Sequence, residues 1–212
     1  MSGKRMAIRS QGGFTFIELM ITLAISVTIA SVTFITLMPS FFKNHVDLAY
    51  ETTLAVLRNT RHLAITQSHQ YFVNFNPAGF PAGTIQVTYQ PPAVGGILPA
   101  IQQVATYRIP TDVTFSVKTG FPTNAPDGFG TGISAIDFGQ GLGAGSLNYV
   151  CFMPDGSSKD NLGNYNSGVV YLTRQADPTI YTARSISIWG ATGRVRGWHL
   201  YKVSGTTMWV QQ

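Results

Sequence analysis

The sequence predicts an α+β protein in which one long N-terminal helix precedes a C-terminal antiparallel β-domain. Residues 14–38 form an uninterrupted apolar run that lacks Gly and Pro and carries a single charge, Glu18. From residue 71 onward, short runs rich in β-branched and aromatic residues alternate with turns that contain Gly, Pro or Asn. This alternation is typical of strands. A long helix followed by a series of strands is the α+β arrangement.

The composition is that of a folded protein with little charge. Of 212 residues, 44% are hydrophobic and only 11% are charged, which argues against a disordered, highly charged chain. The single cysteine, Cys151, excludes an intramolecular disulfide framework and a cysteine-based zinc site. The net charge is +5, but Lys4, Arg5 and Arg9 lie within the first 13 residues. Without them eleven basic residues oppose nine acidic ones, so bulk charge does not predict a nucleic-acid partner.

The apolar run is long enough to cross a membrane. Its 25 residues would form a helix of roughly 37 Å, whereas a bilayer core is about 30 Å thick. The basic segment 1–13 predicts a cytoplasmic N-terminus and places the rest of the chain across the membrane. A cleaved secretory signal is the competing interpretation, but the run is too long and lacks an A-x-A-like site. A plain anchor leaves Glu18 unexplained, because an unpaired carboxylate in hydrocarbon is costly.

Cleavage between Gly13 and Phe14 would explain this acid. Glu18 would become the fifth residue of the mature chain, about one helical turn from a new amino group with which it can pair. Residues 12–19, GGFTFIEL, resemble the prepilin cleavage motif of type IV pilins and type II secretion pseudopilins. The resemblance implies that prepilin peptidase, a membrane aspartic peptidase, cuts after Gly13 and that Phe14 becomes N-methylated. It also implies that Glu18 guides assembly by pairing with the N-terminus of a neighbouring subunit.

A second helical segment, assigned to residues 39–70, is expected after the apolar run. Pro39 should break or kink the helix, because it lacks a backbone donor and clashes with the preceding turn. From about residue 40 to 68 apolar residues recur with helical spacing, which predicts an amphipathic helix with one face on a sheet. The apolar stripe consists of Phe42, Val46, Ala49, Val56, Leu57, Leu63 and Ala64.

Strands are expected over most of residues 71–212. The β-like runs are 71–75, 84–89, 104–109, 113–117, 135–138, 149–153, 168–173, 182–189, 194–203 and 206–210. Turn signals such as Asn76-Pro77 and Asp155-Gly156 separate them. The Gly-rich segment 120–145 predicts a long surface loop around one short strand.

Four segments in the second half narrow the resemblance. They are YVCFMPDG at 149–156, GVVYL at 168–172, RSISI at 184–188 and GRVR at 193–196. With the N-terminus, they resemble the GspH/FimT family of minor pilins and pseudopilins. The resemblance implies a pilin-like fold, in which a leader peptide is followed by a transmembrane helix, a periplasmic helix and a globular β-domain. These parts correspond to residues 1–13, 14–38, 39–70 and 71–212.

The resemblance also implies a structural function. The processed chain would join other pilin or pseudopilin subunits in a type II secretion pseudopilus or a type IV pilus. Before assembly it would span the bacterial inner membrane once, with the leader in the cytoplasm and the β-domain in the periplasm.

Arg194 and Arg196 suggest an alternative function. If residues 180–189 and 194–198 form a hairpin, its four-residue turn places Trp189 opposite Arg194. Alternation then puts both arginines on one face with Ser187, Trp189 and Trp198, and turns Ile186, Ile188 and Val195 to the other. Arginines flanked by aromatic residues suit phosphate contacts and base stacking. The segment GRVR resembles the motif with which some FimT-like proteins bind DNA during natural transformation, whereas the bland interpretation is a solvated strand face.

No catalytic constellation is predicted, and no cofactor or metal is expected. His45, His62, His69 and His199 are scattered, with the first three expected on the helix. Cys151 lies in an apolar strand and is expected to be a buried, unreactive thiol.

Two weaker motifs are also interpreted without a ligand. Residues 139–144 match a loose dinucleotide fingerprint, but a strand follows where that site needs a helix. A loop containing Asp155, Asp160, Asn161 and Asn164 could bind calcium, and a plain polar turn is favoured there.

Overall fold

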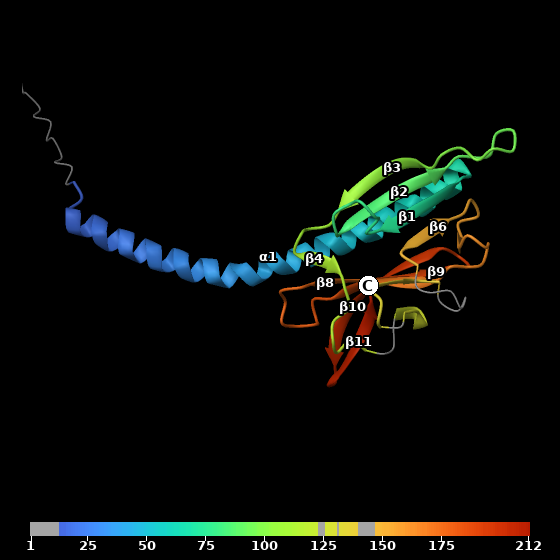
Figure 1. Cartoon of the computed structure of the whole chain (residues 1–212). Coiled ribbons are helices and arrows are strands. Elements are labelled where there is room, and N and C mark those ends of the chain that lie inside the picture. Colours follow the sequence, from blue (N-terminus) through green and yellow to red (C-terminus); the bar gives the residue numbers. More distant parts are fainter. Residues whose placement is uncertain (1–12, 123–125, 131, 140–146) are drawn as a thin grey trace, which may run out of the picture. The chain divides into compact units, whose positions relative to one another are not determined.

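The computed structural model describes residues 13–122, 126–130, 132–139 and 147–212, and for residues 35–43 it describes the backbone alone. The predicted leader therefore lies outside the described residues except for Gly13. The chain divides into two units, one ending at Phe42 and one spanning Lys43–Gln212. One helix, α1, extends from Phe16 to Gln67 and belongs to both units (Figure 1).

The first part of α1 is apolar on every side. Residues Phe16–Phe34 are long and apolar enough to span a membrane, with a mean hydropathy of 2.0, and none of them is buried. The break expected at Pro39 does not occur, because the helix continues through this residue. A proline removes a single backbone donor, and the helical runs on both sides keep their own hydrogen bonds.

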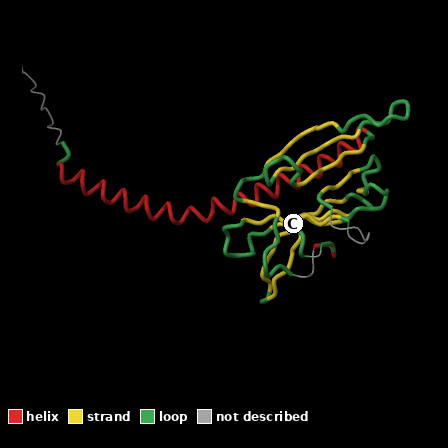
Figure 2. The backbone as a smooth tube through the Cα atoms, in the orientation of Figure 1, coloured by secondary structure: helices red, strands yellow, loops and turns green. Residues whose placement is uncertain are grey.

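The second unit contains two antiparallel sheets (Figures 1 and 2). The first has the order β3-β2-β1-β6-β7. Its strands are β1 (Gln70–Phe75), β2 (Thr84–Gln90), β3 (Gln102–Arg108), β6 (Tyr149–Phe152) and β7 (Ser158–Lys159). The second has the order β11-β10-β9-β8-β4, with β5 also paired to β8. Its strands are β4 (Val113–Phe115), β5 (Ile136–Phe138), β8 (Gly168–Arg174), β9 (Arg184–Trp189), β10 (Arg194–Val203) and β11 (Thr206–Gln211). A single 3-10 turn, η1, covers Pro126–Gly128.

The α+β fold predicted from the sequence is confirmed. Every predicted β-like run overlaps a strand, and the strands pair antiparallel throughout. Strand β7 was not predicted, because its two residues, Ser158 and Lys159, carry no apolar pattern. The division of the strands between two sheets was not predicted either, since the pattern of a strand does not name its partner.

The predicted apolar stripe of α1 lies in the core of the second unit from Val46 onward, and the side chain of Phe42 lies outside the described ones. Ala49, Leu57 and Ala64 are fully buried, and Leu63 packs against the same cluster. The cluster also holds inward-facing residues of both sheets, among them Val73 and Phe75 of β1, Val170 and Leu172 of β8, and Ile186 and Ile188 of β9. One face of the helix packs on a sheet, as expected, and it shares one continuous core with both sheets.

We expect a fragment of residues 43–212 to fold cooperatively without the apolar helix. Its core is complete within that range, as Leu57 at 0% exposure illustrates. Leu57→Ala should lower the free energy of unfolding by about 2–5 kcal/mol in urea titrations, because it leaves a cavity. Leu48 lies on the same helix but is 57% exposed, so Leu48→Ala should change stability by less than about 0.5 kcal/mol. Equal losses in the two variants, or a fragment without a cooperative transition, would contradict this description of the core.

Candidate functional site

The predicted cleavage point lies immediately before α1. Phe14 is 82% exposed, and no atom lies within 4 Å of the place where Gly13 would carry a Cβ. Thr15 caps the helix: its side-chain oxygen accepts the N–H of Glu18 at 3.3 Å, and its carbonyl accepts that of Leu19 at 3.1 Å. The bond between Gly13 and Phe14 thus lies in an accessible, non-helical position.

With one exception, the polar side chains between Phe16 and Phe34 find their hydrogen-bond partners within the same helix. Each hydroxyl in this stretch donates to a backbone carbonyl one turn earlier on the same helix. These donors are Thr22, Ser26, Thr28, Ser31 and Thr33. Such internal bonds remove the cost of placing a hydroxyl in hydrocarbon. Within the described residues the carboxylate of Glu18 has no hydrogen-bond or ion-pair partner, so it is the one polar group here that requires a partner from outside.

The hairpin predicted for the two arginines is present. Arg194 pairs with Trp189 and Arg196 pairs with Ser187 across β9 and β10. The side chains of Ile186, Ile188 and Val195 belong to the core, as expected from alternation. The indole nitrogen of Trp198 donates to the Ser187 hydroxyl at 2.8 Å, which confirms that both lie on the arginine face.

Arg196 is not a freely solvated side chain. Its guanidinium forms an ion pair with Asp127 of η1, whose carboxylate is only 6% exposed. The other carboxylate oxygen of Asp127 accepts the Ser187 hydroxyl at 2.6 Å. The interpretation of the whole face as solvated is therefore wrong, because Asp127 neutralises the second arginine. Of the two arginines on this face, only Arg194 is exposed and leaves its charge for an anion, and this does not favour DNA binding.

Arg61 of α1 holds two turns of the β-domain together. Its Nε donates to the carbonyl oxygen of Gly156 at 3.0 Å, and a terminal nitrogen donates to that of Thr192 at 2.9 Å. Thr192 lies in the β9–β10 turn, and Gly156 lies in the turn between β6 and β7. The sequence indicated only that Arg61 falls off the apolar stripe, because the carbonyls it binds are 95 and 131 residues away.

Packing explains why position 193 of the GRVR segment is a glycine. Its φ is +59°, and a Cβ here would overlap the carbonyl oxygen of Gly156 and lie 2.9 Å from Nε of Arg61. Only glycine allows the two turns to approach this closely. The glycine of this motif therefore follows from packing, not from binding of a ligand.

Residues 8–34 match the prokaryotic N-terminal methylation motif. The chain has a prepilin-type N-terminus. The match includes Gly13, Phe14 and Glu18 and confirms the resemblance found in the sequence of this segment. Since it covers the leader and the apolar helix, it concerns the first unit of the chain and not the β-domain.

Two solved structures are similar to this chain over most of its length. Both are crystal structures of the type IV minor pilin FimU of Pseudomonas aeruginosa, in two space groups. One is 12% identical and covers 78% of this chain and 93% of its own, with a TM-score of 0.43. The other is also 12% identical and covers 76% and 94%, with a TM-score of 0.40. No curated protein sequence matches the chain.

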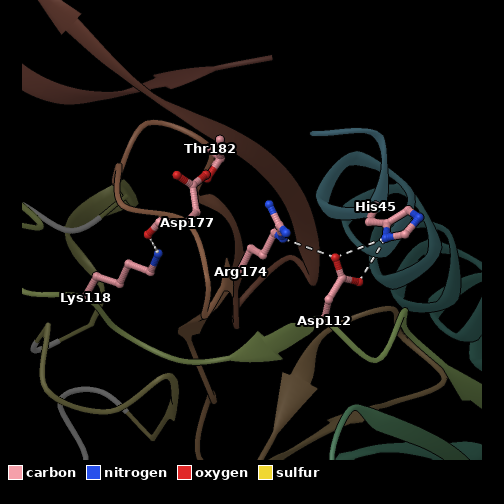
Figure 3. Close-up of polar contacts among 6 residues, drawn as sticks. All are labelled: His45, Asp112, Lys118, Arg174, Asp177 and Thr182. Carbon is pink, nitrogen blue, oxygen red and sulfur yellow. Dashed lines mark hydrogen bonds and ion pairs between the residues drawn. The ribbon is translucent and has the colours of Figure 1, made fainter. Parts of the chain in front are cut away.

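A polar cluster joins the start of the second unit to β8. Asp112 lies between His45 of α1 and Arg174 of β8 (Figure 3): its carboxylate is 2.9 Å from Nδ1 of His45 and 3.3 Å from Nε of Arg174. Nearby, Nζ of Lys118 donates to the backbone carbonyl of Asp177 at 2.6 Å. A carboxylate shared by two basic groups bridges helix and sheet, so the cluster has a structural role.

The other histidines are held apart. His62 is exposed on α1, while His69 lies just after the helix, which ends at Gln67 rather than including it as expected. The ring of His69 packs against Tyr89, and that of His199 packs edge-on against Tyr50. Among the described residues no group of three or more His, Cys, Asp or Glu side chains could hold a metal ion.

The environment of Cys151 is that of an unreactive thiol. The side chain is buried in β6, and this burial raises the pKa of the thiol to about 12. At neutral pH the group is therefore protonated and a poor nucleophile.

The loop considered for calcium is a set of polar turns. Asp155 accepts the hydroxyl and backbone N–H of Ser157, and these bonds hold the pKa of its carboxyl below the usual value. Asp160 accepts the backbone N–H groups of Leu162 and Asn164. Of the dinucleotide-like segment, residues 140–144 lie outside the described residues, and the strand expected after it is β6.

We expect Gly193→Ala to destabilise the 43–212 fragment more than Gly205→Ala. Both glycines have positive φ and lie in hairpin turns, but no atom lies within 4 Å of a Cβ at Gly205. Gly205→Ala should therefore cost about 1–2 kcal/mol for the left-handed backbone alone. Gly193→Ala should lower the free energy of unfolding by a further ~1–3 kcal/mol, because its Cβ would also overlap Gly156. Urea unfolding measures both losses, and equal values would show that the two turns separate without cost.

Proposed function

We propose that the chain is a minor pilin or pseudopilin that leaves the inner membrane to join a type IV pilus or type II secretion pseudopilus. The observation that carries this proposal is Glu18. Among the described residues its carboxylate has no partner, whereas every hydroxyl between Phe16 and Phe34 bonds within the helix, and it lies within a matched N-terminal methylation motif. A membrane anchor has no use for such a group, whereas an assembling subunit uses it to find its neighbour.

Processing supplies the partner that Glu18 lacks. Prepilin peptidase cuts after Gly13 and leaves Phe14 with a free, then methylated, amino group. In hydrocarbon a carboxylate and an ammonium group attract strongly, since little water screens them. The carboxylate of one subunit therefore pairs with the amine of the next, and this pairing sets the axial register between neighbouring helices.

The apolar surface of α1 serves the membrane first and the filament afterwards. Residues 16–34 are exposed on all sides, which is unfavourable in water but suits lipid. In the filament these side chains exchange contacts with lipid for contacts with neighbouring helices. The basic leader stays in the cytoplasm, so the β-domain is in the periplasm before assembly.

We expect Gly13→Leu to block processing. Gly13 is the residue beside the scissile bond, and only a residue without a side chain should fit the peptidase there. The variant should remain in the membrane as the full-length precursor, as judged by intact-mass spectrometry. Gly12→Ala, one residue earlier, is the control and should still be cut. An N-terminal methyl-Phe14 in the Gly13→Leu variant would refute the assignment of the cleavage site.

We expect Glu18→Leu to separate assembly from insertion. Removal of an intramembrane carboxylate should leave membrane insertion unchanged or improved. Incorporation into sheared filaments should fall by roughly tenfold or more, because the lost ion pair lies in a low dielectric.

The matched control is Glu51→Leu. Glu51 is an exposed acid on the same helix but in the second unit, so its removal should leave incorporation unchanged. The proposal fails if the Glu18→Leu chain is processed and enters filaments at the wild-type level.

A further inference from the structure

An arginine-lined groove lies between α1 and the β9–β10 hairpin, entirely within the second unit. Its volume is about 710 Å³. We call it the arginine groove; it is lined by Arg58, Arg61, Trp189, Thr192, Arg194, Val195 and Arg196. No Asp or Glu is among the described residues that line it. One lining arginine, Arg196, is paired with a carboxylate from outside the lining, that of Asp127.

The four arginines of the groove fall into two kinds. Arg61 is held by backbone carbonyls and Arg196 by Asp127. The side chains of Arg58 and Arg194 are exposed and form no hydrogen bond or ion pair with the part of the chain that the structure describes. One comes from the helix and the other from β10. Two guanidinium groups without partners suit a carboxylate, which each can bind through two parallel hydrogen bonds.

The groove also has an apolar wall. Trp189 is 46% exposed, and its ring is held edge-on by Phe129 with the centroids 5.3 Å apart. A fixed, half-exposed indole is suited to an aromatic or aliphatic side chain.

We propose that the arginine groove binds an acidic segment of a partner protein, with a carboxylate between Arg58 and Arg194 and a neighbouring apolar side chain on Trp189. A nucleic acid fits these observations less well. Duplex DNA carries a charge about every 1.7 Å along its axis and binds best to a track of cations. Here the groove offers two unpaired arginines rather than a track of cations, Asp127 neutralises Arg196, and the chain after Gly13 has only two more basic than acidic residues. This binding site goes beyond the proposed filament role and does not depend on cleavage at Gly13 or on Glu18.

The test uses the full chain in a neutral detergent and a defined peptide, acetyl-Gly-Ser-Glu-Phe-Glu-Ser-Gly-amide. Calorimetry should give a dissociation constant of about 10 µM to 1 mM. The same peptide with both Glu replaced by Gln should bind at least about tenfold more weakly, because hydrogen bonds to a charged group are the stronger ones.

Variants of the two free arginines locate the site. Arg58→Gln and Arg194→Gln should each weaken binding of the acidic peptide by about tenfold or more. The control is Arg108→Gln, which removes one exposed positive charge from β3, outside the groove, and should leave affinity within about twofold. Near-ultraviolet circular dichroism checks that each variant is folded, and Arg194→Lys, which keeps the charge, provides a second variant of the same position.

A variant of the apolar wall tests the second contact. Trp189→Ala should weaken binding of the Glu-Phe-Glu peptide but leave a Glu-Ala-Glu peptide nearly unchanged. If the variant weakens binding of both peptides equally, Trp189 does not contact the Phe side chain of the peptide.

Four results would overturn the proposal. They are no heat of binding up to about 5 mM peptide, equal binding of the Gln peptide, wild-type affinity in both arginine variants, or tighter binding of a DNA duplex of about 12 base pairs that the peptide cannot displace. The last result would assign the groove to nucleic acid. None of them would alter the expected processing at Gly13 or assembly through Glu18.

Discussion

Both sheets of the β-domain depend on one contact, the apolar stripe along the second part of α1. A sheet with one apolar face must cover it, and here a single helix covers both. Ala49 and Ala64 are fully buried beside Leu57, and their small side chains let the strands approach the helix closely. The same stripe explains why the charged residues on this part of α1 lie outside the core.

Polar contacts then fix how the helix is rotated against the strands. Asp47 of α1 accepts two bonds from Arg184 of β9, at 2.8 and 2.9 Å, and the arginine side chain is only 5% exposed. Burial of a guanidinium is tolerated because its partner is present. Arg61, about four turns further along the helix, contacts the turn at the other end of β9. Apolar packing alone would allow the helix to slide, whereas these directional bonds do not.

The first part of α1 differs from the second, because its apolar side chains pack on no core and are exposed. Its hydroxyl side chains donate to their own helix, so the surface offered to lipid or to neighbouring helices is apolar. Glu18 breaks this pattern within the first turn of the helix. A single carboxylate without a partner can fix the axial register between neighbouring helices. Dispersion contacts between apolar helices do not provide this.

The sequence by itself determined the features that follow from local periodicity. These include the membrane-length helix with Glu18, the apolar stripe, nearly all of the strands and the pairing of Arg194 with Trp189. Only the tertiary structure decided the partners of the arginines. Asp127 lies 69 residues from Arg196, and the carbonyls bound by Arg61 belong to distant turns. Of the break or kink predicted at Pro39, the break does not occur, because the neighbouring helical turns outweigh a local preference. The local pattern of side chains determines which face of an element is buried. Which residue pairs with a buried charge depends on the fold of the whole chain.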